Sequence, residues 1–335
     1  MYHLLGLSLA LAALLTLNAL VALAVAALWR GWLDARTRCW PASARAQLLF
    51  ALRVAPFAFA LVVVGALVLP AYWLYEPAAS AEVVSAKLAA LAALATTGLA
   101  LAAWRGLAAW RATHRLTARW LSHAEPIKIA GLEVPAYSVA HRFPVVAIVG
   151  AFRPRLFIAR QLLTELTADE LRAALAHEAG HLAARDNLKR AVLRACRDAL
   201  TIVPVGRALD RAWGESAEAA ADEHAARVGD ADAALDLAAA LIKIARLAPP
   251  GARPLLPAAA FLIGELDGGT VAWRVRRLTQ LAAGDAARAR ARLHPAWVWA
   301  GGAALLLVAA LVGAFDARVL AGTHTALEYV VSALR

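Results

Sequence analysis

Four apolar stretches, each long enough to cross a lipid bilayer, alternate along the chain with segments rich in charge. They cover residues 4–29, 54–75, 83–104 and 296–315. A hydrocarbon core of about 30 Å needs about 20 helical residues, and alanine and leucine, which dominate these stretches, are strong helix formers. The pattern predicts an α-helical membrane protein with four transmembrane helices. Three of them lie within residues 1–104, the fourth is 296–315, and 316–335 form a short exterior tail.

The first stretch resembles the apolar core of a signal peptide, but its flanks do not fit one. Met1, Tyr2 and His3 precede it without any lysine or arginine, and the basic residues come after it. A cleavable signal peptide has its basic residues in front of the apolar core. We therefore interpret residues 4–29 as a retained span.

Residues 105–295 have the mixed pattern of a water-soluble domain. Short apolar runs separated by glycine and proline predict a small sheet near its start. Thr167 and Glu170 then form the Thr-x-x-Glu pattern of a capping box, so a helix is expected to begin near residue 168. Further helices are expected at 187–201, 204–213, 215–228 and 231–247, with a break at Gly214 and a proline-rich linker at 249–257.

Composition and charge agree with a membrane location. Hydrophobic residues make up 62% of the chain and its net charge is +11. The arginines gather beside the apolar stretches, as the positive-inside rule expects of cytoplasmic loops, so residues 105–295 are predicted to be cytoplasmic and both termini exterior. Direct nucleic-acid binding is the less favoured explanation of the charge. Cys39 and Cys196 lie far apart without a metal-binding spacing and are expected to be free thiols.

The predicted capped helix carries His177-Glu178-Ala179-Gly180-His181. Residues four apart share one helix face, so the imidazoles of His177 and His181 can converge on one metal ion. Glu178 is rotated by one residue, which brings its carboxylate beside the attacking water as a general base. The alternative is a helix face that buries two imidazoles and a carboxylate without a metal, which is costly. The motif therefore predicts a Zn²⁺ site with Glu178 as the catalytic group.

A catalytic zinc ion usually has three protein ligands, so one more is expected from elsewhere in the domain. Glu218 and Asp222 lie four residues apart, and the three alanines between them allow a close approach of two helices. We predict that Glu218 is the third ligand and that Asp222 accepts a hydrogen bond from a ligand histidine. By themselves, two acidic residues on one helix face are more often solvated. The competing third ligands are Glu215, Glu223, His224 and Asp186.

These motifs, taken in order, resemble the BlaR/MecR-type antirepressors, which are integral membrane gluzincins that signal β-lactam exposure. The resemblance covers about 140–230 and the four-helix layout. It rests on the segments 149–158 (VGAFRPRLFI), 166–171 (LTADEL), 177–181 with Asp186, and 218–223. It implies an α+β gluzincin-like metallopeptidase domain on the cytoplasmic side of a bacterial inner membrane. Zinc would be held by His177, His181 and Glu218, with Glu178 as base and Asp222 in support.

Two observations limit this resemblance. HtpX-like and CAAX-type membrane proteases share both motifs and are the alternative family, although the Arg-Pro segment and the position of the domain between spans three and four favour the antirepressors. The antirepressors also carry a penicillin-binding sensor domain after the fourth span, whereas here about twenty residues follow it. A separate sensor protein is therefore an expected partner.

The predicted function is a zinc metalloendopeptidase that cleaves a cytoplasmic or membrane-proximal protein in signalling or regulated proteolysis, with a transcriptional repressor as a candidate substrate. A substrate strand is expected to add to the edge formed by Pro144, Val145, Val146, Ala147, Ile148 and Val149. His141, Arg142 and His224 are candidates for stabilising the oxyanion. The alternatives are an HtpX/CAAX-type protease in quality control or processing, a signalling scaffold with a vestigial metal site, and a basic module that recruits partners. The intact Glu178 favours an active protease.

Overall fold

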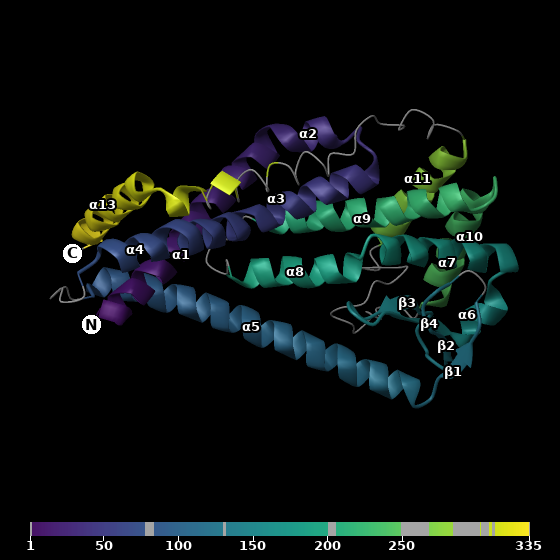
Figure 1. Ribbon diagram of the computed structural model, residues 1–335. Coiled ribbons are helices and arrows are strands. Elements are labelled where there is room, and N and C mark those ends of the chain that lie inside the picture. The colour runs from purple at the N-terminus through teal and green to yellow at the C-terminus, as the bar shows by residue number, and fades with distance from the viewer. Residues whose placement is uncertain are drawn as a thin grey trace.

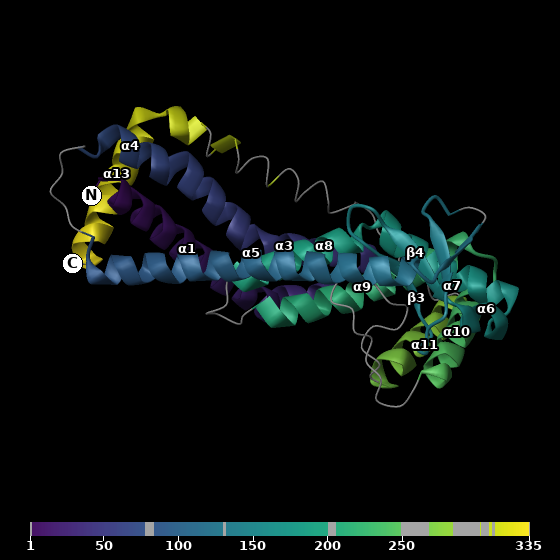
Figure 2. The same ribbon diagram turned by 90° about the horizontal axis from the view of Figure 1, so that it is seen from below.

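The computed structural model describes residues 2–77, 84–129, 132–199, 206–248, 268–283 and 312–334, together with residues 302, 308 and 309. Long helices occupy one end of the molecule, and a small sheet with its surrounding helices occupies the other (Figure 1, Figure 2). Both chain termini lie at the end that is far from the sheet.

Three of the described helices are long and apolar enough to cross a membrane. The first comprises α1 (Tyr2–Leu28), a π-helical segment (Trp29–Leu33) and α2 (Asp34–Thr37). The second comprises α3 (Ala42–Val63), a π-helical segment (Val64–Val68) and α4 (Leu69–Tyr75), and the third is α5 (Ala86–Leu121). Each helix continues into the basic residues that flank its apolar stretch: the first beyond residue 29, the second before residue 54 and the third beyond residue 104, although the third begins at Ala86 instead of residue 83. Most of the predicted fourth span, 296–315, lies outside the described residues.

The small mixed sheet has the strand order β1-β2-β4-β3. Its strands are β1 (Glu125–Ile127), β2 (Ala136–Val139), β3 (Val146–Val149) and β4 (Arg155–Ala159). β2 and β4 are parallel, and the other two pairings are antiparallel. β3 is an edge strand, yet all four of its residues are buried. The edge that we expected to be exposed for a substrate is therefore covered in this structure.

Seven further helices are described after the sheet, and two of them, α7 and α9, test predictions made from short sequence patterns. They are α6 (Arg160–Glu165), α7 (Ala168–Ala183), α8 (Asp186–Ala199), α9 (Arg207–Val228), α10 (Ala233–Leu247), α11 (Gly268–Ala282) and α13 (Ala317–Leu334). The capping box is confirmed, because Thr167 accepts the backbone N–H of Glu170 and the Glu170 side chain accepts that of Thr167. The predicted break at Gly214 is wrong. A helical glycine costs only about 1 kcal/mol, and packing on both sides of it keeps α9 continuous.

That packing joins α9 to the membrane helix α3. Leu209, Trp213 and Ala217 of α9 recur every four residues and are buried in one cluster with Leu49 and Leu52 of α3. An ion pair between Asp210 and the buried Arg53 of α3 lies beside this cluster, with 2.9 Å between Nε and Oδ1. The helix that carries Glu218 and Asp222 is thus fixed directly to a candidate span.

Candidate metal centre

The centre depends on the close approach of α7 and α9 at Gly180. A Cβ atom added to Gly180 would lie 3.1 Å from Cα of Ala221 and 3.1 Å from Cβ of His224. Such a distance is tighter than ordinary van der Waals contact, so only glycine fits without a shift of one helix. The small residues Ala219 and Ala221 are buried at the same crossing. The alanine spacing that we used to predict this approach therefore has a partner in Gly180.

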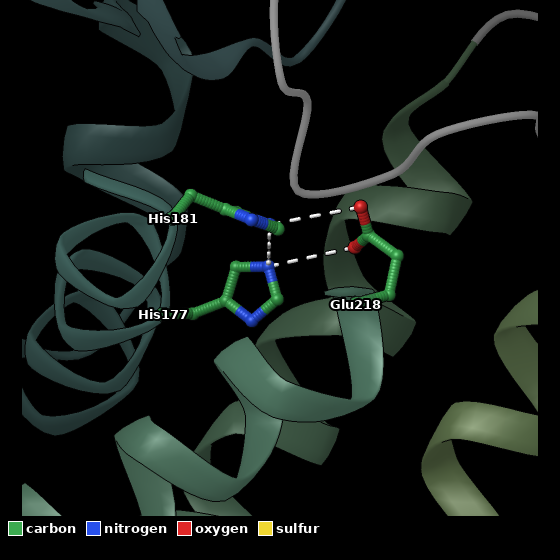
Figure 3. Close-up of side chains that lie close together, drawn as sticks. All are labelled: His177, His181 and Glu218. Carbon is green, nitrogen blue, oxygen red and sulfur yellow. Dashed lines mark hydrogen bonds and ion pairs between the residues drawn. The ribbon is translucent and has the colours of Figure 1, made fainter. Parts of the chain in front are cut away.

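His177 and His181 of α7 face Glu218 of α9 across this crossing (Figure 3). The two Nε2 atoms are 3.1 Å apart. Oε2 of Glu218 lies 3.6 Å from Nε2 of His177, and Oε1 of Glu218 lies 3.6 Å from Nε2 of His181. Zinc bonds of about 2.0–2.2 Å in a tetrahedral site separate neighbouring ligand atoms by about 3.3–3.6 Å. The 3.6 Å separations, each to a different oxygen of Glu218, lie at the upper end of this range, and the 3.1 Å between the two Nε2 atoms lies slightly below it. The three side chains are therefore grouped closely enough to hold one zinc ion.

Each histidine is held by a carboxylate on its other ring nitrogen. Nδ1 of His177 lies 2.9 Å from Oδ1 of Asp222, and Nδ1 of His181 lies 2.7 Å from Oδ2 of Asp186. A proton placed on each Nδ1 and donated to the carboxylate leaves the Nε2 lone pair for a metal ion. Asp222 thus has the predicted supporting position. Asp186, a competing third ligand in the sequence, supports the second histidine instead.

Glu178 is completely buried beside the two histidines. Its Oε2 accepts the backbone N–H of Ile148 in β3 at 3.2 Å, and its Oε1 has no hydrogen-bond partner among the described residues. Burial raises the pKa of Glu178 above its ordinary value, against the lowering effect of the two nearby imidazoles. A carboxylate with one unengaged oxygen and a raised pKa is suited to accept a proton.

Two arginines that the sequence did not suggest for the site flank Glu218. Nη1 of Arg274, from α11, lies 3.2 Å from Oε2 of Glu218, and Nη2 of Arg190, from α8, lies 3.1 Å from Oε1. Arg274 also donates its Nε–H to Oδ2 of Asp222 at 3.0 Å and is almost fully buried. In the sequence Arg274 belongs to a basic group ahead of a predicted span, where the positive-inside rule accounts for it without a site. Its role depends on a fold contact across 52 residues.

The electrostatics of the centre favour a positive charge between the two imidazoles. Burial acts to lower the pKa of His181, but the Glu218 charge and the hydrogen bond with Asp186 raise it to about 10. Burial acts in the opposite direction on Asp222, whose pKa Arg274 and His177 nevertheless lower to about 2. The pKa of Glu218 is also held well below its ordinary value, against the effect of burial, by the charge of His181 and by hydrogen bonds with both histidines. Glu218 and Asp222 are therefore ionised at neutral pH, and either a proton or a metal ion satisfies the site.

The remaining candidate residues have other contacts. Glu223 pairs with Arg277 of α11 and accepts the backbone N–H of Ala42 at 3.4 Å, so it is turned away from the histidines. The His141 ring lies against Trp120, and its Nδ1 accepts the backbone N–H of Phe143. None of the contacts described for Glu215, His141 or Arg142 involves His177, His181 or Glu218. His224 packs against Gly180 and does not belong to the group of His177, His181 and Glu218 that could hold a metal ion.

A cavity of about 340 Å³ opens next to His181. It is lined by Ile148 of the edge strand, by Leu182 and by Phe152, whose ring is 84% exposed. At its inner side, Asn187 donates from Nδ2 to the backbone carbonyls of Ile148 and Gly150. The outward-facing N–H and C=O of Ile148 are thus both engaged, one by Glu178 and one by Asn187. A substrate strand that pairs with Ile148 has to displace both side chains.

Comparison with known families supports a metallopeptidase. The model of Peptidase family M48 matches residues 111–241, a segment that contains His177, Glu178, His181 and Glu218 and ends before Arg274. Searches of curated proteins and of solved structures found no match. The match supports an M48 zinc metallopeptidase, while the BlaR/MecR subtype stays a prediction.

Replacement of Gly180 by alanine is expected to weaken zinc binding, because the added methyl group has to push α9 and Glu218 away from the two histidines. Gly214→Ala is the matched control, since a Cβ there meets nothing within 4 Å and alanine is favoured in a helix by about 1 kcal/mol. Zinc titration of both purified variants measures the effect. Equal zinc affinity in the two variants would show that the crossing does not set the ligand geometry.

The double variant His177→Ala, His181→Ala is expected to lose one zinc ion per chain relative to the unmodified protein, because two of three donors are removed. Elemental analysis after dialysis against zinc measures the difference. Asp222→Ala is expected to keep the ion but to bind it about 10 to 100-fold more weakly, because the hydrogen bond that orients His177 is lost. The ligand assignment is wrong if the double variant retains as much zinc as the parent.

Proposed function

We propose that the chain is a membrane-embedded zinc metalloendopeptidase that hydrolyses peptide bonds of a protein substrate. The observation that carries this proposal is the placement of Glu178, which is buried beside the two histidines and has one carboxylate oxygen unengaged. The M48 match and the three apolar helices support the coarser description, a membrane-associated metalloprotease.

The roles of the chain's own residues follow from their contacts. His177, His181 and Glu218 hold the metal, and when bound, Zn²⁺ supplies a Lewis acid that polarises the scissile carbonyl and activates water. Glu178 takes the proton of the attacking water on Oε1 and hands it to the leaving amine. Asp222 and Asp186 fix the two imidazoles. Arg274 and Arg190 hold Glu218 from both sides, which keeps this carboxylate oriented toward the two histidines.

The substrate is proposed to enter through the cavity beside His181 and to pair with β3. Pairing replaces the Glu178–Ile148 hydrogen bond by a bond to the peptide, so the same event that positions the substrate also releases the second oxygen of Glu178. In the absence of a peptide, the hydrogen bond from Ile148 of β3 satisfies the buried carboxylate of Glu178 until the substrate strand takes its place.

The cellular role is proposed from the resemblance and the arginine asymmetry. A cytoplasmic or membrane-proximal protein, with a transcriptional repressor as the first candidate, is cleaved in response to a separate sensor protein, at a bacterial inner membrane. An HtpX/CAAX-type role in quality control or processing is the second candidate. Both motifs that it shares with the antirepressors lie inside the segment matched by the M48 model.

Glu178→Gln is expected to keep its zinc and its fold but to lose peptide-bond cleavage by about 100 to 10,000-fold, because an amide cannot take the proton. Glu165→Gln, an exposed glutamate on α6, is the matched control and keeps full activity. Cleavage of an unfolded casein substrate by the purified protein in detergent measures both. Parental turnover in Glu178→Gln rejects the proposed mechanism.

The topology is tested by labelling in a background without native thiols (Cys39→Ser, Cys196→Ser). Glu165→Cys in the metallopeptidase domain is expected to resist a membrane-impermeant maleimide in intact spheroplasts and to react after permeabilisation. Arg318→Cys, exposed at the start of α13, is expected to react without permeabilisation. The reverse pattern would place the metallopeptidase domain outside the cytoplasm.

A further inference from the structure

The outer edge of β3, which faces away from β4, is occupied by a side chain with the chemistry of a peptide group. The carbonyl of Val145 accepts the backbone N–H of Ala159 from β4 at 2.7 Å. Along an antiparallel strand, successive residues direct their backbone groups to opposite sides, so the N–H and C=O of Ile148 point outward. The Asn187 carboxamide donates from Nδ2 to the carbonyls of Ile148 at 2.8 Å and of Gly150 at 3.2 Å. A side chain thus takes the place of a pairing strand.

Glu178 and Asn187 together provide the acceptor and the donor that one residue of a bound peptide would provide. A residue paired antiparallel with Ile148 accepts its N–H and donates to its C=O. Here the acceptor is Oε2 of Glu178, 3.2 Å from the backbone nitrogen of Ile148, and the donor is Nδ2 of Asn187. A substrate residue therefore pairs fully with Ile148 only by replacing both side chains.

The carboxamide of Asn187 is only partly satisfied in this position. Its orientation is fixed, because an oxygen in the place of Nδ2 would face two carbonyl acceptors. The other amide atom, Oδ1, is buried and has no hydrogen-bond partner among the described residues. A buried acceptor without a donor is unfavourable. A peptide that takes over the two carbonyls would therefore also release Asn187 from an unfavourable state.

The cavity next to the edge gives an incoming peptide access to this contact. Its volume is about 340 Å³, and its lining includes Ile148, Asn187 and the metal-ligating His181. Asn187 follows directly after Asp186, which lies 2.7 Å from Nδ1 of His181. The closed edge, the cavity and a metal-ligating histidine are therefore neighbours, as a peptide held beside the metal requires.

We propose that Asn187 is a positioning residue that keeps the peptide-binding edge of β3 closed until an extended segment of a protein substrate displaces it. This role of Asn187 rests on the proposed function, because it concerns how that substrate reaches Glu178. An extended segment offers an N–H and a C=O to Ile148, whereas a helical segment uses these groups internally. The closed edge therefore selects extended or unfolded segments, and it weakens their binding by the contacts that they have to replace.

Removal of the Asn187 contact is expected to tighten peptide binding, whereas loss of a purely structural side chain would weaken it. The full-length Glu178→Gln protein keeps an acceptor for the N–H of Ile148 and leaves the substrate intact. Its dissociation constant for fluorescein-labelled, unfolded casein is measured by fluorescence anisotropy in detergent with saturating zinc. In this background Asn187→Ala is expected to bind casein about 10-fold more tightly, because two neutral hydrogen bonds no longer compete with the peptide.

Leu188→Ala is the matched control. Leu188 also lines the cavity, but its apolar side chain cannot hydrogen-bond to β3, so its removal enlarges the space without opening the edge. We expect this variant to bind casein no more tightly than the background. With Glu178 restored, Asn187→Ala is expected to lower KM for casein and to leave kcat nearly unchanged, because the contact opposes binding and not the chemical step.

Circular dichroism and the elution profile establish that each variant is folded. If Asn187→Ala does not fold, Asn187→Ser replaces it, because serine suits the start of a helix and its single hydroxyl proton cannot serve two carbonyls. The proposal is overturned if the Asn187 variant binds casein no more tightly than the background, if Leu188→Ala tightens binding equally, or if no variant binds. Absence of cleavage by the unmodified protein would contradict the proposed function alone, since the anisotropy comparison does not depend on turnover.

Discussion

The close crossing of α7 and α9 is the constraint on which the metal centre depends. Neither helix alone supplies more than two donors, and Gly180 is the position at which their backbones come within reach of each other. With the helices at this distance, Glu218 faces both histidines and Asp222 reaches the outer nitrogen of His177. A larger separation would move both carboxylates together, because they share one face of α9.

The buried carboxylates around the two histidines need positive charge to compensate them, and this is the second constraint on the metal centre. Four carboxylates, those of Glu178, Asp186, Glu218 and Asp222, surround two imidazoles in a nearly dry region. Burying so many acidic groups is costly unless each one is paired. Arg274 and Arg190 provide part of the compensation by pairing with Glu218, and Arg274 also pairs with Asp222. Nη2 of Arg274 also lies 3.4 Å from Nε2 of His177, so the positive charge of this guanidinium is close to two of the three metal-ligating side chains.

What the sequence could predict follows from how local each signal is. The capping box, the spacing of His177 and His181, and the short apolar runs of the sheet strands involve residues within a few positions of each other, and their helical or extended geometry is enough to place them. The continuity of α9 through Gly214 and the arrival of Arg274 in the centre depend on contacts between distant segments. Asp186 lies between these cases, since it is near His181 in sequence but reaches its Nδ1 only because the chain turns at Arg185, whose φ is 54°.

The contact between α9 and α3 gives the membrane helices a direct mechanical relation to the metal ligands. Leu209, Trp213 and Ala217 pack on α3 within the same continuous helix that presents Glu218 one residue further on. Protein interiors resist compression, and a well-packed helix moves as a unit. The helix α7 packs closely on α9 at Gly180, and it also contacts α10 and β3. Glu218 and the two histidines therefore lie in one packed unit, which α9 joins to α3.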